Sequence, residues 1–254
     1  MGRAEAPRRA RPRRRVTAMR IAIVNPNSTR AMSDVIAAAA RRVAGPDVTI
    51  LTLTNTDGPP SIQGVVDGAA ALPGLLSLVA ATQADAFVIA CFDDTGLDAA
   101  RCVADVPVIG IGEAACHAAS LVAHRFSIVT TLARSVPILR NNLETHGLAR
   151  KCASILATDI PVLQLEHASG ETLARLEATV ERAIVEDGAE AIVLGCAGMA
   201  DLAARLERRF QVPVIDGIGS AVGLAAALVR MGVTTSRQGL YASASAPASE
   251  RMAV

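Results

Sequence analysis

The sequence predicts an α/β protein built from two pseudo-symmetric lobes, each a four-stranded parallel sheet flanked by helices, with a cleft between them. Three observations support this fold class. Short aliphatic runs alternate with Ala-rich helical segments, aromatic residues make up 2% of a composition that is 51% apolar, and one sequence unit occurs twice. Strands that alternate with helices are typical of parallel sheets with right-handed crossovers.

The repeated unit is centred on a cysteine. Each copy has an acidic residue, Asp85 or Glu190, six places before the cysteine, Cys91 or Cys196, and a Val-Pro-Val-Ile strand after it. The cysteine-to-proline spacing is 16 residues in the first copy and 17 in the second. A duplicated fold closed on itself would bring the two thiols face to face across a cleft.

Each element follows from its local pattern. Strands are expected where apolar residues run together or alternate, and helices where an apolar period of about 3.6 ends at Gly or Pro. In the first half we expect strands at 20–24, 48–54, 86–91 and 107–111, and helices from 29 or 30 to 43, at 66–82 and up to 104, the last capped by Asp93, Asp94 and Thr95. In the second half we expect strands at 126–130, 155–160, 191–196 and 212–216, and helices from 135 to 146 and at 170–187, 199–209 and 217–231.

These elements divide the chain into lobes and two terminal segments. Residues 19–112 with 217–235 are expected to form the first lobe, and residues 113–216 the second. Residues 1–18 carry seven Arg against one Glu, a net charge of +6 in a chain of +1, and are interpreted as a disordered Arg-rich leader. Residues 236–254, rich in Ala and Ser, are interpreted as a flexible tail. The body has no basic patch, so no nucleic-acid partner is expected.

Composition also excludes several classes of protein. No apolar run reaches the length of about 18 residues that a membrane span needs. Five cysteines with no CxxC pair and no secretory signal indicate free thiols in the cytoplasm and no metal site. The only lysine, Lys151, lies in a polar connection, so a pyridoxal-phosphate Schiff base has no convincing anchor and no cofactor is expected. The Ala- and Leu-rich helix at 221–231 is compatible with a homo-oligomer.

A small-molecule site is expected where the strands end. Ligands of open parallel sheets bind outside the carboxyl ends of the strands. Four side chains are expected at such ends, and the residues that follow them are the remaining candidates for substrate contact. The candidates are Cys91 and Cys196 for catalysis, and Asn25, Phe92, Asp93, Thr130, Thr131, Ala197 and Gly198 for substrate binding.

Two opposed thiols suit one kind of chemistry. A thiolate removes a proton from one face of a carbon while a thiol on the other face returns one, and the roles exchange for the other enantiomer. A helix N-terminus after each cysteine is expected to lower the thiol pKa from about 8.5 toward about 7, whereas Asp93 and Asp94 oppose this at Cys91. The other three cysteines, Cys102, Cys116 and Cys152, have no counterpart in the other half of the chain and fit small buried side chains.

The chain resembles the aspartate/glutamate/hydantoin racemase superfamily, most closely its hydantoin and allantoin racemase branch, over about residues 20–232. The motifs that carry the resemblance are Asn25-Pro26-Asn27-Ser28-Thr29, Gly58-Pro59-Pro60-Ser61-Ile62-Gln63-Gly64, Ala90-Cys91-Phe92, Gly110-Ile111-Gly112-Glu113-Ala114, Val129-Thr130-Thr131 and Leu194-Gly195-Cys196-Ala197-Gly198-Met199. The resemblance implies that Cys91 and Cys196 are the acid/base pair and that neither a metal nor an organic cofactor is needed.

Two departures from the branch concern the substrate. Hydantoin enzymes follow the first cysteine motif with Gly-Asp-Pro, where this chain has Asp93-Asp94-Thr95, and Val65-Val66 stand where aromatic residues are frequent. Both lie at the expected pocket and bear on the substrate more than on the reaction type. From the resemblance we expect a racemase of a 5-substituted hydantoin or allantoin. The alternatives are an amino-acid racemase, a maleate-type isomerase or a malonate decarboxylase of the same fold, or a non-catalytic protein that binds a small molecule.

Overall fold

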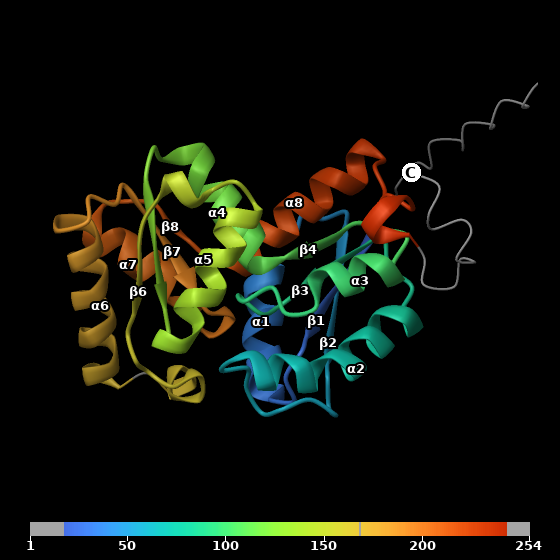
Figure 1. The fold of residues 1–254 in the computed structure, drawn as a ribbon, viewed down its shortest axis with the longest axis horizontal. Coiled ribbons are helices and arrows are strands. Elements are labelled where there is room, and N and C mark those ends of the chain that lie inside the picture. The colour runs from blue at the N-terminus through green and yellow to red at the C-terminus, as the bar shows by residue number, and fades with distance from the viewer. Residues whose placement is uncertain (1–17, 168, 243–254) are drawn as a thin grey trace, which may run out of the picture.

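Two four-stranded parallel sheets form the body of the protein, and their strands follow the same order (Figure 1). In the computed structural model, which describes residues 18–167 and 169–242, the first sheet has the order β2-β1-β3-β4 and the second β6-β5-β7-β8. The predicted fold class is therefore confirmed. Residues 1–17 of the expected leader and 243–254 of the expected tail lie outside the described residues.

The first sheet and its helices occupy the N-terminal half of the chain. The elements are β1 (Met19–Asn25), α1 (Arg30–Val43), β2 (Val48–Thr54), α2 (Val65–Ala81), β3 (Ala86–Ile89), α3 (Leu97–Val103) and β4 (Val108–Gly110), followed by α4 (Ile111–Val122). The expected capping of α3 is wrong. This helix begins only at Leu97, after Asp94 and Gly96 adopt left-handed backbone with φ of 53° and 72°, and no side chain caps it.

The second sheet repeats this arrangement. Its elements are β5 (Phe126–Thr130), η1 (Ala133–Ser135), α5 (Val136–Thr145), η2 (Ala149–Lys151), β6 (Cys152–Ala157), η3 (Val162–His167), α6 (Gly170–Val185), β7 (Ala191–Gly195), η4 (Ala197–Leu202), α7 (Ala203–Phe210) and β8 (Val214–Ile215), followed by α8 (Gly217–Met231) and η5 (Gly239–Tyr241). Here η denotes a 3₁₀ helix. Asp216 caps α8, and its carboxylate accepts a hydrogen bond from the Gly219 N–H at 2.8 Å.

One predicted strand is displaced along the chain. The expected strand at 155–160 is instead β6, which pairs with β5 from Cys152 to Ala157. The strand stops there because Asp159 has left-handed backbone with φ of 53° and Pro161 has no N–H to donate. Similarly, the helix expected at 199–209 starts as the 3₁₀ turn η4 and becomes α-helical only at Ala203.

The two sheets share one core. Alternate residues of β1 point to opposite faces of the first sheet. Ile21 and Ile23 therefore join a cluster with Phe126 and Ile128 of β5. Ala22 and Val24, on the other face, pack against residues of α2 and α3. The helices α1, α4, α5 and α8 contribute to the shared cluster and lie between the sheets, whereas α6 and α7 cover the outer face of the second sheet (Figure 1).

The last helix ties the lobes together. α8 follows the second sheet but packs against α1 and α4, and its first residue, Gly217, lies where a Cβ would stand 2.7 Å from the Ile111 carbonyl oxygen. A side chain there would force the helices apart. Beyond α8, the described part of the expected flexible tail packs on α3: Arg237 pairs with Asp105 at 2.7 Å, and the Tyr241 hydroxyl donates to Asp98 at 2.9 Å.

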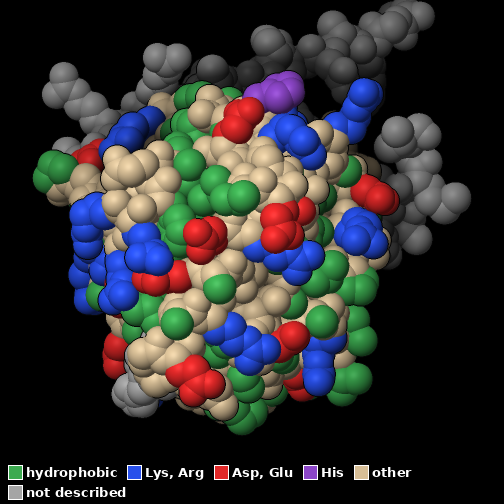
Figure 2. Space-filling view, turned by 90° about the vertical axis from the view of Figure 1, so that its left-hand side faces the viewer, with side chains coloured by type: hydrophobic (Ala, Val, Ile, Leu, Met, Phe, Trp, Pro, Cys, Tyr) green, Lys and Arg blue, Asp and Glu red, His purple; other side chains and the backbone are tan. Residues whose placement is uncertain are grey.

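The outer surface of the second lobe carries mixed charge. Figure 2 shows Lys and Arg side chains interspersed with Asp and Glu on this side of the molecule. Arg205 and Arg209, both on α7, pair with Glu177 of α6 at 3.3 and 3.2 Å. These pairs leave no uniformly basic face on this side. Within residues 18–167 and 169–242, we find no helix that combines the length and the apolar character required to cross a membrane.

Candidate active site

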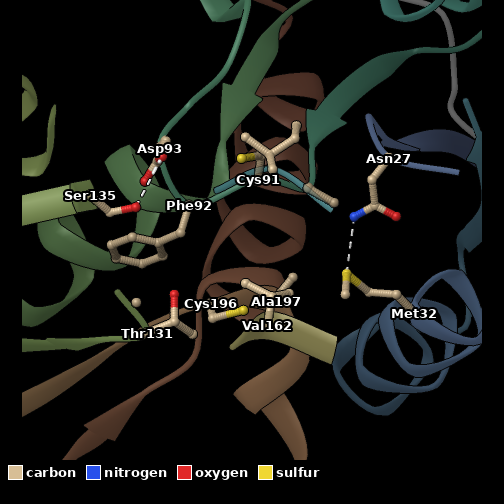
Figure 3. Close-up of a pocket in the computed structure, with 13 residues that line it drawn as sticks. Asn27, Met32, Cys91, Phe92, Asp93, Thr131, Ser135, Val162, Cys196 and Ala197 are labelled. Atoms are coloured by element: carbon tan, nitrogen blue, oxygen red, sulfur yellow. Dashed lines mark hydrogen bonds between the residues drawn. The ribbon is translucent and has the colours of Figure 1, made fainter. Parts of the chain in front are cut away.

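Cys91 and Cys196 line the same cavity between the lobes. Cys91 comes two residues after β3, and Cys196 directly follows β7, so each lies at the carboxyl end of a central strand of its own sheet. Figure 3 shows the two cysteines on opposite walls of the pocket, with open space between them. The cavity has a volume of about 40 Å³, which is room for only a few water molecules.

Gly195, the residue before Cys196, is small enough for the end of β7 to lie close to the end of β5. Gly195 ends β7 beside β5, and a Cβ on it would lie 2.8 Å from the Cβ of Thr130. The Thr130 hydroxyl also donates a hydrogen bond to the Gly195 carbonyl oxygen at 3.1 Å. The close pairing of these strand ends therefore determines where Cys196 begins to leave the sheet.

Most of the predicted substrate-binding residues lie at this cavity. Phe92, Asp93, Thr131 and Ala197 line it together with the two cysteines. Gly198 contributes its backbone N–H, which hydrogen-bonds to the sulfur of Cys196. These residues come from both lobes, as expected for a site between two sheets.

Two predicted residues do not line the cavity. The Asn25 amide is fully buried and donates to the Asn27 side-chain oxygen and the Ser33 hydroxyl, each at 3.0 Å. Thr130 is 1% exposed and bonded to the backbone of β7. Both side chains therefore hold strand ends and loops in place.

Other residues line the cavity that the sequence-based candidates did not include. They are Asn27, Met32, Ile62, Ala90, Ser135, Val162 and Gly195. Asn27 and Ile62 belong to the loop motifs described above, so these motifs could have identified both residues as candidates for the site. Val162 comes from the 3₁₀ turn after β6, where no periodic pattern marks a side chain as facing a ligand.

The environment of the cavity opposes thiolate formation. Burial raises the pKa of Cys91 to about 12, and the charge of Asp93 adds to this rise, while the Thr95 hydroxyl, 3.3 Å from the sulfur, acts in the opposite direction. Burial also raises the pKa of Cys196 to about 11, again with a contribution from Asp93. The expected lowering of both pKa values by helix N-termini is therefore wrong for these two buried thiols.

Asp93 is the acidic side chain of this site. Burial raises its pKa to about 6, against the hydrogen bond from the Ser135 hydroxyl at 3.3 Å. Its backbone is held separately, because the Asn142 side-chain amide donates to the Asp93 carbonyl oxygen at 3.0 Å. Ser135 and Asn142 belong to the second lobe, so both hold a loop of the first lobe across the cleft.

Asp94 points away from the cavity and supports the same loop. Its side chain is 6% exposed and accepts hydrogen bonds from the backbone N–H groups of Gly112 and Glu113 at 3.0 and 2.8 Å. His146, the residue directly after α5, lies 3.9 Å from the Asp94 carboxylate, which raises the pKa of His146. Asp94 therefore caps α4, eighteen residues further along the chain, instead of α3.

The described residues contain no group of three or more His, Cys, Asp or Glu side chains arranged to hold a metal ion. The remaining cysteines, Cys102, Cys116 and Cys152, are free thiols that do not line this cavity. Burial raises the pKa of Cys152 to about 11. The cavity therefore offers two thiols, one carboxyl group, and hydroxyl and amide groups as its chemical functions.

Comparisons with known proteins agree with this arrangement. The Asp/Glu/Hydantoin racemase family model matches residues 21–225. The hydantoin racemase of Rhizobium meliloti is 45% identical over 227 residues, which cover 88% of this chain and 94% of that protein. An allantoin racemase structure from Klebsiella pneumoniae superposes with a TM-score of 0.87 at 46% identity, covering 91% of this chain and 96% of that one.

A second structure gives the same result. The allantoin racemase from Pseudomonas fluorescens has a TM-score of 0.87 at 38% identity and covers 90% of this chain and 98% of its own. Both lobes and the cleft between them therefore lie within the matched length. On this evidence the chain belongs to the Asp/Glu/hydantoin racemase family.

Proposed function

We propose that this protein is a cofactor-independent racemase of a hydantoin-like compound, either a 5-substituted hydantoin or allantoin, and that Cys91 and Cys196 are its acid/base pair. The observation that supports this most directly is that two thiols, one from each lobe, line one cavity. The names of the similar proteins, hydantoin racemase and allantoin racemase, support the substrate class.

The reaction requires proton transfer on both faces of one carbon. The hydrogen at C5 of the ring is acidified by the adjacent carbonyl, so a thiolate removes it and leaves an enolate. The thiol on the opposite face then donates its proton to C5, which inverts the centre. One sulfur ends protonated and the other ionised, the reverse of the start, and the enzyme is then set for the other enantiomer.

Polar groups around the cavity suit a planar ring with amide edges. Asn27, Thr131 and Ser135 offer side-chain donors and acceptors to the ring N–H and C=O groups, while Met32 and Phe92 provide apolar walls. Donors aimed at the carbonyl oxygen stabilise the enolate as charge develops on it. This assigns the polar residues to orientation and electrostatics, and the sulfurs to proton transfer.

The cavity must enlarge to admit this substrate. At about 40 Å³ it holds a few water molecules and is too small for a substituted five-membered ring. The lobes therefore separate for entry and close over the bound ring. Closure excludes water, which strengthens the hydrogen bonds to the enolate.

The test uses Cys91→Ala and Cys196→Ala with each enantiomer in D₂O, followed by polarimetry and proton NMR. Racemisation has an equilibrium constant of one, so each variant loses inversion in both directions. A variant with one sulfur left still exchanges the C5 hydrogen of the enantiomer that this sulfur faces, without inverting it. The two variants should therefore exchange opposite enantiomers.

The matched control is Cys102→Ala, which removes a free thiol outside the cavity and should racemise like the wild type. A sample without enzyme corrects for spontaneous exchange. Wild-type racemisation by either cavity variant would rule out the two-thiol mechanism. A covalent substrate adduct on either sulfur, seen by mass spectrometry, would indicate nucleophilic chemistry instead.

A further inference from the structure

Asp93 is the unusual member of the cavity lining. Among the described residues that line the cavity, it alone carries a formal charge at neutral pH. The rest of the lining includes the apolar side chains of Met32, Ile62, Phe92 and Val162. In Figure 3 the Asp93 carboxyl group lies on the same wall as Ser135 and Phe92, away from Asn27 and Met32.

The carboxylate has acceptor capacity left over. A carboxylate accepts about four hydrogen bonds, and the one described here comes from the Ser135 hydroxyl at 3.3 Å. The backbone of Asp93 is fixed by Asn142, so the side chain keeps its place at the cavity wall. A ligand that fills the cavity therefore removes water from a charged group that still needs donors.

The charge of Asp93 also reaches both sulfurs. It raises the pKa of Cys91 and that of Cys196, although the two cysteines belong to different lobes. The other acidic group that acts on Asp93 is its neighbour Asp94, which raises the pKa of Asp93. A donor that offsets the charge of Asp93 would therefore ease thiolate formation at either base.

We propose that Asp93 determines which C5 substituent is accepted, favouring substituents with N–H donors, such as a ureido or ammonium group, over hydrocarbon substituents. This rests on the proposed racemase function. A hydrocarbon group against Asp93 leaves a desolvated carboxylate without a partner, which is costly. An N–H donor replaces the lost water and forms a charge-assisted hydrogen bond.

The experiment compares kcat/KM for allantoin, whose C5 substituent is a ureido group, with kcat/KM for 5-isobutylhydantoin, whose substituent is a hydrocarbon. In the wild type allantoin should be preferred. In Asp93→Asn the ratio of the two values should fall by about tenfold to hundredfold, the range expected for one hydrogen bond to a charged group. Cys102→Ala, which changes a side chain outside the cavity, is the matched control and should keep the wild-type preference for allantoin.

A second readout separates this role from a merely structural one. Loss of the Asp93 charge should move the acid limb of the pH profile for 5-isobutylhydantoin to lower pH, because both thiols then ionise more readily. Asp93→Ser gives a second neutral side chain and should change the substrate ratio in the same direction. Circular dichroism verifies that each variant is folded.

An unchanged substrate ratio in both Asp93 variants would overturn the proposal. So would an equal loss for both substrates, which would mean that Asp93 binds the ring N–H groups common to all hydantoins. Failure of the wild type to racemise either compound would instead count against the proposed function. The two failures are therefore distinguishable in one set of assays.

Discussion

Replacing Asp93 with Asn is expected to stabilise the folded protein at neutral pH, even though it impairs the selectivity proposed above. Burial raises the pKa of Asp93 from 3.8 to about 6. The folded protein therefore holds this proton more tightly than the unfolded chain does. By linkage, the free energy of unfolding contributed by Asp93 falls as the pH rises from about 4 to about 6.

The size of this effect follows from the same shift. Each pH unit between the two pKa values corresponds to about 1.4 kcal/mol, so the rise from 3.8 to about 6 costs about 3 kcal/mol once the group is ionised. Asn has nearly the same shape and no charge at any of these pH values. The variant should match the wild type near about pH 4 and exceed it by about 3 kcal/mol above about pH 7.

Urea denaturation at several pH values measures this difference, and equal m-values would show that both proteins unfold from equally compact states. Asp105→Asn is the matched control, because that side chain is 90% exposed and its ion pair with Arg237 should contribute little. A difference between Asp93→Asn and wild type that stays constant with pH would refute the reasoning. A wild type that is the more stable of the two at pH 8 would refute it as well.

Two further predictions concern the loop that carries Cys91. Asp94→Ala removes the acceptor of two backbone N–H groups at the N-terminus of α4 and should lower the free energy of unfolding by about 2 kcal/mol or more, measured by the same urea titrations. Thr95→Val removes the hydroxyl 3.3 Å from the Cys91 sulfur, which raises the pKa of that thiol. Racemisation by this variant should be slower at neutral pH and recover part of the loss at higher pH, and an unchanged pH–rate profile would contradict this.

The architecture was predictable because it depends on local patterns that occur twice. Ile21 to Val24 are buried on both faces of β1, which is why this run is continuously apolar instead of alternating. The chain alternates strands with helices in both halves, and parallel strands must place their carboxyl ends on one side. This reasoning is sufficient to bring Cys91 and Cys196 to one cavity.

The direction of single side chains at those strand ends was not predictable. Asn25 and Thr130 end corresponding strands, yet both turn to bond neighbouring polar groups instead of facing the cavity. Asp94 was expected to cap the next helix, but its left-handed backbone turns the chain so that the carboxylate reaches α4. Contacts between residues far apart in the sequence decide these cases, and no local pattern encodes them.

The thiol pKa values show why a rule based on helix position fails here. A helix N-terminus stabilises a nearby negative charge by about 0.3–1 kcal/mol, or about 2 kcal/mol in favourable buried geometry. The rise in the pKa of Cys91 from 9.0 to about 12 corresponds to about 4 kcal/mol in the opposite direction. Moreover, α3 begins six residues after Cys91, beyond the reach of its first turn. Both sulfurs are therefore protonated at neutral pH in this arrangement of the lobes. The thiolate that starts catalysis must form either while the lobes are apart or when a ligand offsets the charge of Asp93.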